Sequence, residues 1–163
     1  MIRFNKKIMG LRDSDNYRTP KDFYKRLNAE FHFDFDPCPY KADFDGLVVP
    51  WRGSVFVNPP YSSIEPFVTK GIQELACGNA HTIVYLLPCR TDVRYFHNLI
   101  YGKAELRFIK GRLNFNDAKT PSPFPVYLAI FKKDAPAVNS GAEPVQRLTA
   151  AGQNTGNTLE LDL

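Results

Sequence analysis

Residues 55–61 join a short apolar run to the tetrapeptide Asn-Pro-Pro-Tyr. The run is β-branched and aromatic and follows the turn residues Arg52-Gly53-Ser54, a pattern that predicts a buried strand. Both prolines lack an N–H to donate and fix φ, so the strand is expected to end there. Asn58 is therefore expected at the carboxyl end of the strand, the edge where open α/β sheets bind their ligands.

These residue types suit a planar nitrogen that is a poor nucleophile, such as the amino group of a nucleobase. The side-chain oxygen of Asn58 and the carbonyl of Pro59 could accept both amino hydrogens, which polarises the nitrogen toward a methyl donor without a strong base. Tyr61 could stack on a base taken out of a duplex. The alternative is a Pro-Pro turn that merely closes the strand, with Asn58 as a turn former. The complete tetrapeptide after an apolar strand favours the functional interpretation.

The tetrapeptide matches the signature of amino-group methyltransferases that use S-adenosylmethionine, and it belongs to an ordered set of motifs. The other members are Thr19-Pro20, Asp36-Pro37-Cys38-Pro39, Trp51-Arg52-Gly53, Leu87-Pro88-Cys89-Arg90-Thr91-Asp92 with Phe96-His97, and Gly111-Arg112-Leu113-Asn114-Phe115. With them, residues 17–131 resemble the phage-type DNA adenine-N6 methyltransferase (Dam) family. The tetrapeptide alone is shared with enzymes acting on cytosine, RNA and protein glutamine, whereas the ordered set is more specific.

The resemblance implies an abbreviated Rossmann-like fold with a mostly parallel, doubly wound sheet. It implies a catalytic group made of Asn58, Pro59, Pro60 and Tyr61. It implies a donor site made of Thr19, Pro20, Asp36, Pro37, Cys38, Asp45 and Asn58. The usual glycine-rich loop is missing, and residues 36–38 are expected to take its place, with Asp36 accepting from the donor's ammonium group. Asp45 is a candidate for the ribose hydroxyls, the alternative being a solvated loop acid.

The net charge of +4 and the basic excess around residues 90–119 suit double-stranded DNA as a partner. The candidates for DNA contacts are Arg90, Thr91, Arg112 and the Lys and Arg residues near the N-terminus. The alternatives are a solvated cationic face for the segment and a surface ion pair for Arg90.

Composition excludes several other classes of protein. The three cysteines are widely spaced and lack CxxC pairing, which argues against a disulfide framework or a structural zinc site and fits a reducing cytoplasm, that of a bacterial host if the source is a phage or prophage. No metal is expected in the reaction. No apolar run has the length of a membrane span, and the N-terminus lacks the apolar region of a secretion signal, so no membrane partner is expected.

The domain plan is a flexible basic arm over residues 1–16, a methyltransferase domain over 17–131 and a disordered or loosely packed tail over 132–163. Within the domain, Thr19 is expected to cap a helix with Pro20 at its first position, and Ser62-Ser63 a second helix that Gly78 ends. Strands are expected at 31–36, 55–57, 82–87 (a central parallel strand), 104–109 and 126–131. Residues 110–115 are expected to form a turn into a further short strand, residues 116–125 a loop, and the segment with Val93, Phe96 and Ile100 a helix.

The hypothesis is site-specific methyl transfer from S-adenosylmethionine to the exocyclic amino group of adenine in DNA, with the target base flipped out of the duplex. One alternative is the same chemistry on the cytosine amino group, an RNA base or a protein glutamine. Another is a nucleic-acid-binding module without catalysis, which would not bind the methyl donor.

Overall fold

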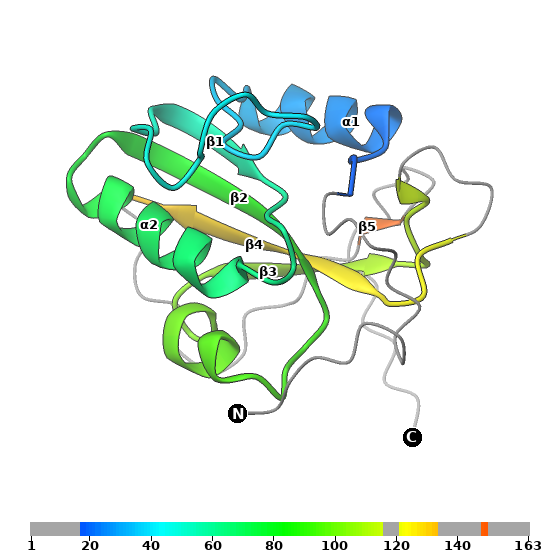
Figure 1. Cartoon of the computed structure of the whole chain (residues 1–163). Helices are drawn as coiled ribbons and strands as arrows, with labels where there is room; N and C mark the ends of the chain where they lie inside the picture. Colours follow the sequence, from blue (N-terminus) through cyan, green and yellow to red (C-terminus); the bar gives the residue numbers. More distant parts are fainter. Residues whose placement is uncertain (1–16, 116–120, 134–147, 150–163) are drawn as a thin grey trace.

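The structure of this chain is a computed structural model that describes residues 17–115, 121–133 and 148–149. The predicted basic arm and most of the predicted tail lie outside the described residues. The elements, in chain order, are α1 (Lys21–Phe31), β1 (Gly53–Val57), α2 (Ile64–Ala76), β2 (Ala80–Pro88), the π-helix η1 (Phe96–Ile100), β3 (Glu105–Lys110), β4 (Val126–Lys132) and β5 (Leu148–Thr149) (Figure 1). None of the helices in these ranges has the length and apolarity needed to span a membrane.

The strands form one mixed sheet in the order β1-β2-β4-β3-β5 (Figure 1). β1 and β2 pair in parallel, with Val55 opposite Ile83, whereas β4 is antiparallel to both β2 and β3. The α/β class is confirmed, but a mostly parallel ladder is not, and β2 is parallel to only one neighbour. Because β4 opposes both of its neighbours, β1, β2 and β3 nevertheless all run in the same direction.

The predicted strand at 31–36 is reduced to a single parallel bridge between Phe35 and Val55. The reason is that α1 continues to Phe31 and His32 then turns the chain with a left-handed φ of 48°. The backbone N–H of Phe56 donates to the Phe35 carbonyl at 3.0 Å, which keeps this segment beside β1. The segment therefore still delivers Asp36 to the same sheet edge as Asn58.

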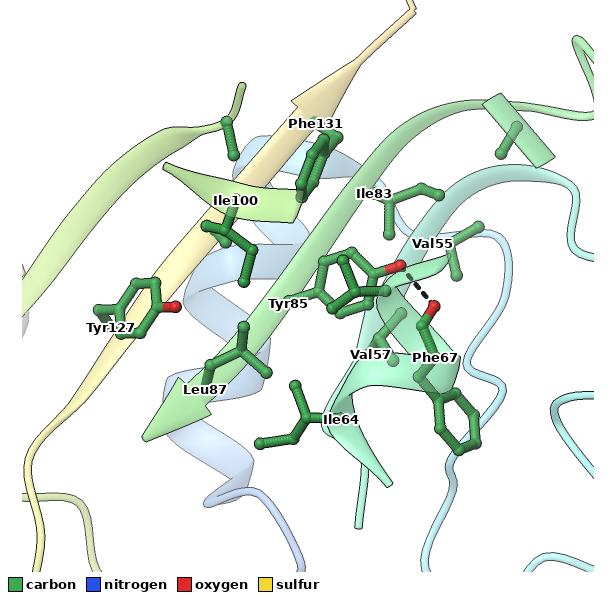
Figure 2. Close-up of a cluster of buried hydrophobic side chains, with 14 of the residues drawn as sticks. Val55, Val57, Ile64, Phe67, Ile83, Tyr85, Leu87, Ile100, Tyr127 and Phe131 are labelled. Carbon is green, nitrogen blue, oxygen red and sulfur yellow. Dashed lines mark hydrogen bonds between the residues drawn. The ribbon is translucent and has the colours of Figure 1, made fainter. Parts of the chain in front are cut away.

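Helical elements cover both faces of the sheet. One face of β1 and β2 packs against α2 and η1, and Figure 2 shows Val55, Val57, Ile83, Tyr85 and Leu87 on this side. The Tyr85 hydroxyl donates to the Phe67 carbonyl of α2 at 3.0 Å, which satisfies a polar group in this core (Figure 2). The opposite face packs against α1 and the chain after β3, through Phe23, Leu27, Phe56, Val84, Leu86, Leu113, Phe115 and Phe124.

Helix termini depart from the predicted capping. Pro20, not Thr19, is the N-cap of α1, and no side chain caps this helix. Ser63 occupies the N-cap of α2 as expected but makes no side-chain capping bond, and Gly78 follows the helix with a φ of +77°. The prediction of Thr19 as a helix cap is wrong because its hydroxyl is engaged elsewhere, as described below.

Two predicted elements that follow β2 differ from expectation. The helix expected around Val93 is mainly the five-residue π-helix η1. No strand lies between β3 and β4 in the described part of the chain, so the short strand expected near residues 111–115 is wrong. Leu113 and Phe115 bury their side chains against the α1 face instead, and the backbone N–H of Ser122 donates to the Leu113 carbonyl at 2.8 Å.

The predicted tail contributes one described element. In β5, Leu148 pairs with Ile109 at the end of β3. At these two residues the chain pairs with the edge of the sheet, and the disordered or loosely packed tail stays a prediction. The other tail residues from 134 onward lie outside the described part of the chain.

Candidate active site

Asn58 directly follows β1, and the nitrogen of its side-chain amide is hydrogen-bonded to the segment before α1. Nδ2 donates to the backbone carbonyl of Tyr17 at 2.6 Å and to Thr19 Oγ1 at 3.1 Å. Because a carbonyl oxygen can only accept, the contact with Tyr17 assigns which end of the amide is nitrogen. Asn58 is only 7% exposed, and its Oδ1 is buried without a donor among the described residues. An unsatisfied buried acceptor costs about 1–3 kcal/mol, a cost that a hydrogen-bond donor reaching this atom would relieve.

Asp36 ends the segment beside β1 and carries a perturbed carboxyl group. Its Oδ1 accepts from the backbone N–H of Cys38 at 2.8 Å. Burial raises the pKa of the Asp36 carboxyl to about 6, although the Cys38 N–H acts in the opposite direction. Burial and the adjacent charge of Asp36 also raise the pKa of the Cys38 thiol, so this thiol is protonated at neutral pH. A cation beside Asp36 would relieve the cost of its buried charge.

A pocket of about 270 Å³ connects these groups. It contains four of the predicted site residues, namely Thr19, Asp36, Cys38 and Asn58. The remaining walls are formed by the basic residues Arg18 and Lys21, by Pro39, and by four aromatic residues. The aromatic residues are Tyr17, Tyr24, Tyr40 and Phe56. A second, more open depression of about 520 Å³ along α2 contains none of the predicted residues.

Three residues predicted for the donor site do not line this pocket. Pro20 is the N-cap of α1, and Pro37 is buried. Asp45 is exposed, and its Oδ1 accepts from the backbone N–H of Leu47 at 2.9 Å, which closes a local turn. The structure therefore gives Asp45 a turn-forming contact and does not bring it to the pocket.

Tyr61 lies in a cluster of aromatic rings next to Asn58. Its ring centroid is 5.2 Å from that of Tyr17, with a tilt of 32°, and 5.2 Å from that of Phe124, in an edge-on arrangement. The Tyr17 ring also contacts Phe115, at 5.5 Å between centroids. The two prolines turn the chain between Asn58 and this cluster: Pro59 is buried, and the Pro60 carbonyl accepts from the backbone N–H of Ser63 at 2.8 Å.

Of the residues predicted to contact DNA, Arg90, Thr91 and Arg112 lie outside the pocket, and those at positions 1–16 lie outside the described residues. Arg90 follows β2 and donates through two nitrogens to the Asp92 carboxylate, at 2.7 and 2.8 Å. The hydrogen bonds from Arg90 lower the pKa of Asp92 to about 2. Thr91 is exposed, and its carbonyl accepts from His97 Nε2 at 2.7 Å. Arg112, also exposed, donates to the Pro123 carbonyl at 2.8 Å.

Sequence reasoning predicted Thr19 but missed three other residues around Asn58 and Tyr61, namely Tyr17, Phe115 and Phe124. Tyr17 acts through its main-chain carbonyl, which every residue possesses, so no residue pattern could have indicated it. Phe115 lies in a motif that was recognised, but no role was assigned to its ring. Phe124 lies in the predicted loop over 116–125, where an aromatic residue between prolines was the only available signal.

One comparison with known proteins relates this geometry to a family. A family model described as DNA N-6-adenine-methyltransferase (Dam) matches residues 9–126. No curated protein and no solved structure gives a match. The matched range includes every residue that lines the pocket, the aromatic cluster around Tyr61, and Arg90, Thr91 and Arg112.

Proposed function

This chain belongs to the Dam family of DNA N-6-adenine-methyltransferases, and from that membership we propose which of its residues carry the reaction. The family's reaction moves a methyl group from S-adenosylmethionine to the exocyclic amino group of adenine in DNA. The observation that carries the assignment is the buried Oδ1 of Asn58. It is an acceptor without a donor in the described ranges, on a side chain that lines the pocket.

Asn58 and Pro59 hold the target amino group. Asn58 Oδ1 accepts one amino hydrogen and the Pro59 carbonyl accepts the other, which directs the nitrogen lone pair toward the methyl group. Both oxygens stabilise the positive charge that the nitrogen gains as the bond between the methyl group and the donor sulfur breaks. The methylated nitrogen then releases one proton to solvent, so no strong base is required. Pro60 fixes the turn, and the base stacks on Tyr61, a contact worth about 1–3 kcal/mol for a base. Reaching this site requires the adenine to leave the duplex.

The walls of the pocket fit the methyl donor. When bound, S-adenosylmethionine supplies a methyl group on a positively charged sulfur and also presents an ammonium group. The buried Asp36 carboxylate accepts from the ammonium, which offsets the cost that raises the pKa of this carboxyl. Thr19 and Cys38 form adjacent walls. The volume of about 270 Å³ lies just below the range of about 300–1,000 Å³ typical of ligand pockets, so part of the donor stays exposed.

The sheet supports an abbreviated Rossmann-like architecture. β1, β2 and β3 run in the same direction, the Phe35 segment adds a parallel edge, and helical elements cover both faces. Pro20 and Pro37 shape the turns that lead into the donor pocket. Double-stranded DNA contacts the partly buried Arg90 and the exposed Thr91 and Arg112.

The test is transfer of tritiated methyl groups to unmethylated duplex DNA, followed by digestion and separation of the nucleosides. Wild-type protein is expected to label N6-methyladenine, and Asn58→Ala is expected to lose at least about 100-fold in rate, the loss typical of removing a group that stabilises developing charge. Asn98→Ala is the matched control, because Asn98 is exposed and lies outside the pocket.

Other outcomes distinguish the alternatives. Label in cytosine would keep the mechanism but change the substrate. Donor binding without transfer to DNA would direct the assay to RNA and protein glutamine. A protein that does not bind labelled S-adenosylmethionine would instead be a non-catalytic nucleic-acid-binding module.

A further inference from the structure

We propose that Thr19 is a positioning residue that fixes the orientation of the Asn58 amide for methyl transfer. This inference rests on the proposed function of Asn58. It departs from the role in donor binding that the family resemblance implies for Thr19. The observation that carries it is the contact between Asn58 Nδ2 and Thr19 Oγ1 at 3.1 Å, which joins residues 39 positions apart.

The two hydrogens of Asn58 Nδ2 have two acceptors. One is the Tyr17 carbonyl at 2.6 Å, and the other is the Thr19 hydroxyl at 3.1 Å. If the amide flipped, Oδ1 would face the Tyr17 carbonyl, and two acceptors would lie against each other. The Tyr17 carbonyl, which can only accept, therefore selects this orientation, and the Thr19 hydroxyl stabilises it as the second acceptor. In this orientation the buried Oδ1 is the atom left without a donor among the described residues.

The Thr19 hydroxyl is free to serve this purpose because it does not cap α1. Pro20 is the N-cap, and no side chain makes a capping bond there. The segment is also held on both sides of Thr19. The Tyr17 ring packs against Tyr61 and Phe115, and Pro20 enters the helix at a φ of −56°. Supporting groups that are themselves fixed can hold a reactive side chain in its productive geometry.

Tyr17 and Thr19 differ in what mutation can reveal. Tyr17 contributes a main-chain carbonyl, which any substitution retains. Thr19 contributes a hydroxyl, which valine lacks at nearly the same shape and serine keeps. The pair Thr19→Val and Thr19→Ser therefore isolates the hydroxyl as acceptor, and Thr19→Ala tests it if the valine variant folds poorly.

The experiment measures single-turnover methyl transfer at saturating donor and DNA, together with the Kd of S-adenosylhomocysteine by calorimetry. Thr19→Val is expected to lower the transfer rate by about tenfold, the effect of one lost hydrogen bond of ordinary strength, with the Kd changed by less than about threefold. Thr19→Ser is expected to restore the rate to within about threefold of wild type, because it keeps the hydroxyl.

An unchanged transfer rate in both Thr19→Val and Thr19→Ala would overturn the proposal. So would a loss that appears only as a weaker Kd and disappears at saturating donor, since that result would make Thr19 a donor-binding residue. Asn58→Ala, measured in parallel, separates this failure from that of the proposed function. If Asn58→Ala keeps the wild-type rate, the assignment of Asn58 itself fails; if only the Thr19 variants behave like wild type, the positioning role alone fails.

Discussion

The two ends of the Asn58 side chain have different partners. Nδ2 is committed to the protein through Tyr17 and Thr19, whereas Oδ1 is buried without a donor in the described part of the chain. Such a division requires a side chain that is a donor at one end and an acceptor at the other. An amide meets this requirement at every pH, and a carboxyl group meets it only when protonated.

Asn58→Asp is therefore expected to be strongly pH-dependent. Above neutral pH the new carboxylate would face the Tyr17 carbonyl, so two acceptors would oppose each other with no donor between them. Methyl transfer should then fall by about tenfold or more. As the pH falls, a protonated carboxyl can donate to the Tyr17 carbonyl and accept with its other oxygen. The ratio of the variant rate to the wild-type rate should rise toward acid pH in single-turnover assays. A ratio that is constant between pH 6 and 9 would contradict the division of roles.

Asp36 shows the cost of a charged group in the donor pocket. Its folded-state pKa of about 6 lies above the unfolded value near 3.9, so its stabilising contribution is present at low pH and is lost as the pH rises through about 6. Asp36→Asn keeps an oxygen that can accept from the Cys38 N–H but carries no charge. The variant should exceed wild type in free energy of unfolding by up to about 3 kcal/mol at pH 8, with little difference near pH 4. Urea denaturation at the two pH values measures this difference.

The same Asp36→Asn variant should bind the methyl donor more weakly, because a neutral amide attracts an ammonium group less than a carboxylate does. Gain of stability with loss of affinity is the pattern expected of a functional site. Asp43→Asn is the control, because Asp43 is exposed and lies outside the pocket. Equal stability of Asp36→Asn and wild type at pH 8 would show that the carboxylate is better solvated than its burial indicates.

At the scale of single residues, the sequence predicted positions that depend on a few adjacent residues. The tetrapeptide placed Asn58 at a strand end, and the Asp-Pro-Cys motif placed Asp36 and Cys38 in the same pocket. The prediction for Thr19 as a cap failed because the partner of its hydroxyl is distant in the chain. A Thr-Pro pair before an amphipathic helix indicates a cap, and it carries no information on a contact with the end of β1.

Among the elements, α2 packs unusually closely on the sheet at Gly71. A Cβ at this position would overlap the Tyr85 hydroxyl and lie 3.0 Å from the Ile83 side chain. Alanine normally stabilises a helix interior by about 1 kcal/mol relative to glycine. Here Gly71→Ala should instead lower the free energy of unfolding by about 1–3 kcal/mol, because the core of β2 must shift to admit the methyl group. Chemical denaturation measures the sign directly.

Two variants test this explanation for Gly71. Thr69→Ala, on the exposed side of the same helix, should be neutral or stabilising, because alanine has the higher helix propensity and no neighbour is displaced. Tyr85→Phe removes the hydroxyl that the new methyl group would meet, so the double variant should be less destabilised than the sum of the two single variants. Strict additivity would locate the strain elsewhere.

The existence of the main elements could be predicted from the sequence, whereas their directions could not. The apolar runs of β2 and β4 identified strands buried on both faces. Burial on both faces is compatible with parallel and antiparallel neighbours alike, so the reversed direction of β4 was not encoded in its pattern. At the edge near Phe35 the pattern predicted too much. The alternation of aromatic and polar residues predicted a full strand, but α1 extends to Phe31, and the residues that follow form only one bridge to β1.

For the whole molecule, the relevant force on DNA is long-range electrostatics. The chain carries a net charge of +4, which favours association with a polyanion and makes that association weaken with salt. The charge of Arg90 is partly neutralised within the protein by the Asp92 carboxylate. Because the pKa of Asp92 is lowered to about 2, this carboxylate stays ionised at every pH at which the enzyme would be assayed. A phosphate that contacts Arg90 must therefore compete with Asp92.

Asp92→Asn should for this reason tighten DNA binding rather than weaken it. The substitution removes the negative charge that pairs with Arg90, so the positive charge of Arg90 acts more strongly on a phosphate and the slope of log K against log salt should become steeper by up to about 0.9. Arg90→Gln should change the slope in the opposite direction. Fluorescence anisotropy with a labelled duplex over a range of salt concentrations measures both.

Glu65→Gln, which makes the same change of charge at an exposed position of α2, controls for net charge alone. If Asp92→Asn binds no more tightly than Glu65→Gln, Arg90 does not lie on the DNA-binding surface.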